Sequence, residues 1–195
     1  MQEKRKSARE KYFENYQAVK VPSNNRRGYR MVYRYTGLFA RWERDGTELA
    51  REKQKLGLME AASVVIYAAS ALSGAPLTKA RLFNGFGVLS LIPWLMELYG
   101  LVRFLFSRKY VKEPDAEEIG NAIRMGCVLR ILLVSLSVTV GEIQTLIGRS
   151  ANWLDIPAAI GMLISAGLSF LIKRRFDSLS LLKYHNANGQ PGSQA

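Results

Sequence analysis

The chain has 195 residues, of which 28 are Lys or Arg and 16 are Asp or Glu, and its mean hydropathy is −0.04. These averages resemble those of an ordinary soluble domain. A single Cys and a single His exclude an intrachain disulfide, a CxxC redox pair and a His-rich metal site. With no P-loop or dinucleotide-binding pattern either, we expect no enzyme activity, metal or cofactor.

The charged residues are strongly segregated along the chain. Residues 1–55 hold 15 Lys/Arg and 7 Asp/Glu, whereas residues 56–106 hold 5 charged residues and residues 125–172 hold 4. A soluble helical bundle needs a polar face on each helix, and stretches such as 156–172 have almost none. The sequence therefore predicts an all-α integral membrane protein with a cytoplasmic N-terminal region, and the lipid bilayer is its first expected partner.

The N-terminal region, residues 1–55, begins with a charged segment that we expect to form a short or frayed helix over residues 1–15. A β-hairpin is predicted over about 16–35, because two strand-like runs flank a turn-rich segment and the second run alternates. An isolated hairpin is marginal in water, so it should dock on another surface. Asp45 is the expected N-cap of a charged juxtamembrane helix over about 46–55.

Basic and aromatic residues are prominent in this region. They suit contact with anionic lipid or a partner protein, although a plain topology signal with a solvated face is the simpler and favoured interpretation. The seven acidic residues among them argue against nucleic acid. The candidate contact residues are Arg26, Arg27, Arg30, Arg34, Arg41 and Trp42.

Four apolar segments are long enough to cross a bilayer, which takes about 20 residues. They run over about 56–77, 82–106, 125–147 and 153–172. Short connections within the first and last pairs predict two helical hairpins. The middle connection, 107–124, is longer and charged, and Asp115 within it is a candidate N-cap for the third helix.

The distribution of cations sets the orientation. With the N-terminus inside, the cytoplasmic segments hold 23 Lys/Arg and the outer loops hold 3. Because cations are retained on the cytoplasmic side, we expect both termini in the cytoplasm and the plasma membrane as the location. The polar tail, 174–195, is expected to be disordered towards its end.

Four ionisable residues fall in the inner halves of the predicted spans, where charge is costly and suggests a site. They are Glu60, Glu97, Arg103 and Arg130. One interpretation is structural, with Glu97 paired to Arg130 and Glu60 to Arg103. The other centres on Glu97, which follows the helix-kinking Pro93 and could bind a proton or cation between Trp94 and Tyr99.

Small residues on the fourth span predict close helix packing. Gly161, Ser165 and Ser169 recur every four residues and therefore share one face. Packing within the chain is the main expectation for this face, and a homo-oligomer contact is the alternative.

Two functions remain open at this point. The first is a non-enzymatic membrane scaffold or accessory subunit whose basic N-terminus contacts anionic lipid or a partner protein. The second is a small oligomeric transporter or channel that uses Glu97 and Arg130.

Overall fold

The computed structural model describes residues 15–184 except 25, 27, 149 and 150. The expected helix at the start of the chain and the expected disordered end of the tail lie outside these residues. The chain forms two compact units, a sheet unit (residues 15–42, 108–116 and 181–184) and a helical unit (43–107 and 117–180).

The sheet unit contains the predicted β-hairpin. Strand β1 (Tyr16–Pro22) pairs antiparallel with β2 (Tyr29–Tyr35), in a register that places Tyr16 opposite Tyr35. Gly28 has a φ of 69°, a conformation that glycine adopts without a Cβ clash, and it returns the chain into β2. The alternating residues thus form a strand where the sequence predicts one.

The unit also contains a second sheet, which the prediction of an all-α protein with one small β-hairpin did not include. Its central strand, β3 (Phe39–Trp42), pairs antiparallel with β4 (Tyr110–Lys112) and with β5 (Leu181–Tyr184). The last strand falls in the segment predicted to be a polar tail. Its backbone groups form their strand hydrogen bonds with β3, which lies far away in the sequence. A local sequence pattern does not predict such a pairing.

Aromatic rings join the two sheets of this unit. Tyr35 contacts Tyr16 and Phe39 edge to face, each with ring centroids 5.2 Å apart. The Lys112 ammonium lies 4.9 Å from the Tyr16 ring centroid and donates a hydrogen bond of 2.7 Å to the hydroxyl of that tyrosine. Trp42 is only 1% exposed. The buried aromatic residues thus form a small core for this unit.

The helical unit begins with α2 (Gly46–Ala71), for which Asp45 occupies the N-cap position as predicted. The predicted juxtamembrane helix is the first part of this one continuous helix. The helix ends six residues before the predicted span does, and Gly74, with a φ of 72°, helps to turn the chain into the short α3 (Pro76–Lys79).

The second predicted span is interrupted. It consists of α4 (Arg81–Leu89) and α5 (Leu91–Phe106), and Ser90 lies between them. The carbonyl oxygen of Gly87, in the last turn of α4, accepts hydrogen bonds from the hydroxyls of Tyr67 (3.0 Å) and Ser90 (2.6 Å). These hydroxyls satisfy a backbone group at the break, as an interrupted helix in an apolar environment requires.

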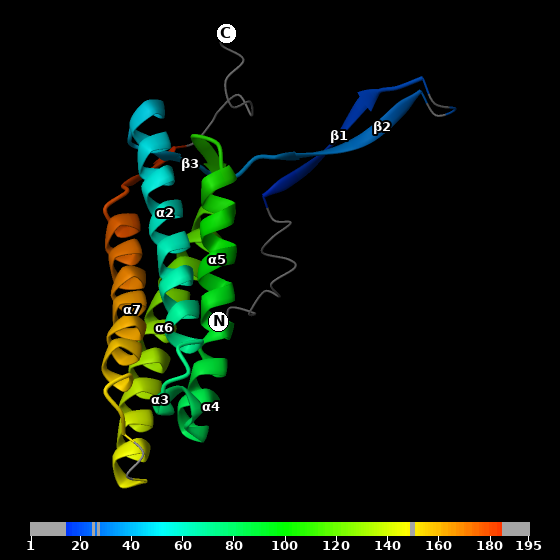
Figure 1. Cartoon of the computed structure of the whole chain (residues 1–195). Coiled ribbons are helices and arrows are strands. Elements are labelled where there is room, and N and C mark those ends of the chain that lie inside the picture. Colours follow the sequence, from blue (N-terminus) through cyan, green and yellow to red (C-terminus); the bar gives the residue numbers. More distant parts are fainter. Residues whose placement is uncertain (1–14, 25, 27, 149–150, 185–195) are drawn as a thin grey trace, which may run out of the picture. The chain divides into compact units, whose positions relative to one another are not determined.

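The two remaining helices are longer than their predicted spans. Helix α6 (Glu113–Ile147) includes most of the segment predicted as a charged connection, and Asp115 lies inside its first turn and not at the N-cap. Helix α7 covers Asp155–Asp177. Figure 1 shows α2, α5, α6 and α7 as the long helices of this unit.

Among the described residues, three helices are long and apolar enough to cross a membrane: Arg81–Phe106 (α4 with α5), α6 and α7. Their outward faces carry large exposed apolar side chains, such as Ile92, Leu132 and Ile156. An apolar exterior of this extent is typical of helices in contact with lipid. The α2 helix is not among the three, because its apolar part is short and rich in Ala and Ser.

Close packing between α5 and α6 should be sensitive to one methyl group. In Gly126→Ala, the new Cβ would lie 2.5 Å from the Glu97 amide nitrogen and 2.8 Å from the Pro93 carbonyl oxygen, so backbone must move. We expect a loss of about 1–3 kcal/mol in the free energy of unfolding, measured in detergent. Gly167→Ala is the control, since nothing lies within 4 Å of its Cβ. Equal losses in both variants would contradict this packing.

Candidate functional site

Arg130 of α6 lies in the core of the helical unit and is only 2% exposed. Its Nη1 is 3.3 Å from Oε2 of Glu97 on α5 and 3.6 Å from Oε1 of Glu60 on α2. A buried guanidinium needs both charge neutralisation and hydrogen-bond acceptors. Two carboxylates from two helices therefore face the same nitrogen.

The other guanidinium nitrogen binds two serine hydroxyls. Nη2 of Arg130 donates hydrogen bonds of 2.8 Å to Oγ of Ser63 on α2 and to Oγ of Ser165 on α7. Each serine is also within 3.1 Å of the other's backbone carbonyl oxygen, to which it can donate. These contacts link α2, α6 and α7 through one side chain, that of Arg130.

The two carboxylates receive further donors. Trp94 Nε1 donates a hydrogen bond of 2.7 Å to Glu60 Oε1, and Ser169 Oγ donates one of 3.2 Å to Glu97 Oε2. We call this group the Arg130 cluster; its members are Glu60, Ser63, Trp94, Glu97, Arg130, Ser165 and Ser169. Among the described residues, Glu60 Oε2 and Glu97 Oε1 are buried and find no hydrogen-bond partner.

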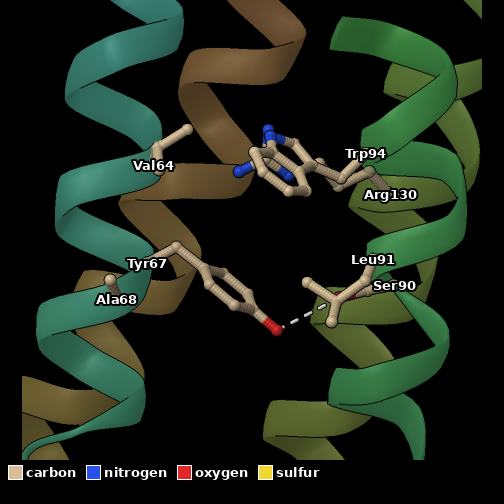
Figure 2. Close-up of a pocket in the computed structure, with 7 residues that line it drawn as sticks. All are labelled: Val64, Tyr67, Ala68, Ser90, Leu91, Trp94 and Arg130. Atoms are coloured by element: carbon tan, nitrogen blue, oxygen red, sulfur yellow. Dashed lines mark hydrogen bonds between the residues drawn. The ribbon is translucent and has the colours of Figure 1, made fainter.

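A cavity of about 190 Å³ borders the cluster. Figure 2 shows side chains from α2 on one side of it and Ser90 with the first turns of α5 on the other, with Trp94 and Arg130 close together at one end. Its walls are mostly apolar, and the Tyr67 hydroxyl lies 3.2 Å from Ser90 Oγ within it. Trp94 belongs to both the cavity wall and the cluster, so the cavity leads to the Glu60 side of the cluster.

The structure brings together three of the four predicted intramembrane charges. Glu97 faces Arg130 as expected, but the expected pairing of Glu60 with Arg103 is wrong. Arg103 instead forms an ion pair of 2.6 Å with Glu118 of α6, at the surface of the unit. Glu60 pairs with Arg130 because both side chains point into the bundle core.

The other two residues predicted to line a Glu97 site, Trp94 and Tyr99, lie in different places. Trp94 is in the cluster, although it binds Glu60 and not Glu97. Tyr99 is 49% exposed and donates its hydroxyl to Glu118 at 3.0 Å, so it forms no wall of the site.

The predicted small-residue face of α7 points into the bundle. Ser165 and Ser169 are fully buried in the cluster, and Gly161 faces Ser70 of α2. Sequence reasoning missed Ser63 as a partner of Arg130. The available signal was its position three residues after Glu60, which places both on one face of a helix.

The candidate contact residues of the N-terminal region lie in the sheet unit. Arg30 and Arg34 are exposed on β2, and Arg26 is exposed in the loop before it, whereas Arg27 lies outside the described residues. Arg41 stacks over the Tyr110 ring at 5.8 Å. Trp42 is buried within the chain, whereas Arg26, Arg30 and Arg34 are exposed.

Within the described part of the chain, no three His, Cys, Asp or Glu side chains gather as metal ligands. Comparisons with known protein families, with curated proteins and with solved structures found no match to this chain.

Removal of the central cation should destabilise the helical unit. Arg130→Leu leaves two carboxyl groups buried without their counterion, and we expect a loss of about 3–5 kcal/mol in the free energy of unfolding. Addition of Glu60→Gln and Glu97→Gln to this variant should restore part of the loss. Thermal and denaturant unfolding in detergent measure both effects.

Arg103→Leu is the matched control for this prediction. It removes an arginine from a partly exposed ion pair, for which we expect a loss of at most about 1 kcal/mol. Similar losses for Arg130→Leu and Arg103→Leu would contradict a central role for the cluster.

Proposed function

We propose that the chain crosses the membrane four times and acts as a non-enzymatic scaffold, with a cytoplasmic hairpin that binds anionic lipid headgroups. The proposal has three parts: the number of crossings, the orientation, and the surface that the hairpin contacts. The exposed, acid-free hairpin is the observation that carries the lipid contact.

The three-stranded sheet supports an even number of crossings. Strand β3 precedes α2, β4 lies between α5 and α6, and β5 follows α7 along the chain. Strands that are hydrogen-bonded in one sheet must lie on one side of a membrane. If the α4–α5 segment crosses once between β3 and β4, then α2 has to cross as well.

The orientation follows from the distribution of cations. The side that carries the sheet unit would also carry 23 Lys/Arg, against 3 in the loops at the opposite ends of the helices. This asymmetry favours a cytoplasmic sheet unit. The plasma membrane stays our expectation for the compartment.

The hairpin has the charge and exposure expected of a lipid-binding surface. Residues 16–42 contain six Lys/Arg and no Asp/Glu. Apolar and aromatic side chains are exposed among them, including Tyr33 (67%) and Met31 (50%). Cations together with exposed aromatic side chains suit the interface of an anionic membrane.

Lipid is a better occupant of this surface than a protein, for two reasons. A short chain segment connects the hairpin to helices that themselves suit a bilayer. Lipid headgroups would therefore always be close to the hairpin. Each cation near an anionic surface contributes about 1 kcal/mol, and such attraction needs no shaped pocket.

A small oligomeric transporter that uses Glu97 and Arg130 is the second candidate. The observation in its favour is the Arg130 cluster itself, where two carboxyl groups meet a single guanidinium among the described residues. Ionisable groups at such depth often mark a proton or ion pathway.

The crossing of α2 can be tested with single cysteines in a Cys127→Ala background. With a membrane-impermeant maleimide, we expect Lys79→Cys to react on intact cells and Ala18→Cys to react only after permeabilisation. Arg108→Cys is the control and should behave like Ala18→Cys, because their segments belong to one sheet unit. Reaction of Ala18→Cys and Lys79→Cys from the same side would contradict the four-span proposal.

The lipid contact can be tested in nanodiscs with an environment-sensitive dye on Ala18→Cys. We expect a more apolar dye environment with phosphatidylserine than with phosphatidylcholine alone, and a reversal at high salt because the attraction is screened. The combined change of Arg26, Arg30 and Arg34 to Gln should remove about 3 kcal/mol of this attraction, half of that from the six cations, and strongly reduce the difference.

The control removes three exposed arginines outside the hairpin, so that both triple variants have the same net charge. Arg51, Arg108 and Arg174 changed to Gln should leave the response to phosphatidylserine in place. An identical dye signal in both lipid compositions with the parent hairpin would contradict lipid contact and point to a protein occupant.

A further inference from the structure

We propose that the Arg130 cluster is a binding site for one proton, which the carboxyl groups of Glu60 and Glu97 share at neutral pH. The inference does not depend on the lipid contact or on transport. It would hold for any function of the membrane unit.

The first argument is the balance of charge. Fully ionised, the cluster would carry two negative charges and one positive charge among the described residues, all of them buried. An uncompensated charge in an apolar core costs several kcal/mol. One bound proton removes this excess and leaves a single buried ion pair.

The second argument is hydrogen bonding. Glu60 Oε2 and Glu97 Oε1 are the buried oxygens without a partner among the described residues, and an ionised carboxylate can only accept. Both carboxyl groups face the same nitrogen of Arg130, at 3.6 Å from Glu60 and 3.3 Å from Glu97. A proton on either one supplies the donor that this pair lacks.

The surroundings favour a proton over a metal cation. Helix α7 contributes only hydroxyls, from Ser165 and Ser169, and these already bind Arg130 and Glu97. Helix α6 contributes the Arg130 guanidinium, which repels a cation, and the buried thiol of Cys127, which is a poor ligand while protonated. A sodium ion would need several more oxygen ligands than the two free ones.

The position of the site gives proton release a mechanical consequence. Glu60 lies on α2 and Glu97 on α5, and these two helices provide opposite walls of the neighbouring cavity (Figure 2). Loss of the proton leaves two carboxylates, one on each helix, that repel one another beside Arg130. Deprotonation should therefore loosen the contact between α2 and α5.

The infrared carbonyl stretch of a protonated carboxylic acid tests the proposal directly in the full chain in nanodiscs. We expect one such band at neutral pH that shifts in heavy water. Glu60→Gln and Glu97→Gln should each abolish it, because Arg130 then neutralises the one carboxylate that remains. Glu118→Gln is the control and should keep the band, since Glu118 pairs with Arg103 away from the cluster.

Three outcomes would overturn the proposal. If the parent protein shows no protonated carboxyl band at neutral pH, both carboxyl groups of the cluster are ionised. Loss of the band in Glu118→Gln alone assigns the proton elsewhere. Loss of the band on addition of sodium at constant pH shows that the site takes a metal cation.

The pH dependence of unfolding supplies a second measurement. A glutamate in the unfolded chain releases its proton above about pH 4–5, whereas the native cluster still holds one. The free energy of unfolding should therefore fall as the pH rises from this range to the pH at which the native cluster loses its proton. The folded-to-unfolded ratio should drop up to tenfold per pH unit there. Glu60→Gln and Glu97→Gln should flatten this slope, and an unchanged slope in both would contradict a shared proton.

Discussion

A single buried guanidinium organises the helical unit. Arg130 cannot lie in an apolar core without acceptors for its N–H groups and a counterion for its charge. The partners come from α2, α5 and α7, at distances from 2.8 to 3.6 Å. A shift of any one helix by a turn would remove its partner, so the cluster specifies how the four helices align.

The sheet unit supplies a second constraint, which acts through the order of the chain. Strands β3, β4 and β5 come from three separate segments that adjoin the ends of the long helices. Their hydrogen bonds bring these three segments, which are far apart in the sequence, into one antiparallel sheet.

Much of this arrangement could be predicted from sequence. Segregated charge indicated apolar helices after a basic region, alternation indicated the β1–β2 hairpin, and one interpretation of the charges within the spans paired Glu97 with Arg130. These signals are local or one-dimensional. The break at Ser90 was predicted only in part, from the kink expected at Pro93. A carbonyl group at the break accepts a hydrogen bond from a tyrosine of another helix, and a local pattern does not indicate such a distant partner.

The sequence by itself determined the apolar helical segments and the β1–β2 hairpin, since hydrophobic periodicity and charge act within a few residues of one another. Only the tertiary structure decided which charges meet. Glu60 and Arg103 lie at similar predicted depths, yet they point in different directions around their helices, one into the core and one to the surface. Likewise β5 became a strand because β3 offered it hydrogen bonds. Long-range partners of this kind are chosen by packing, which no single segment encodes.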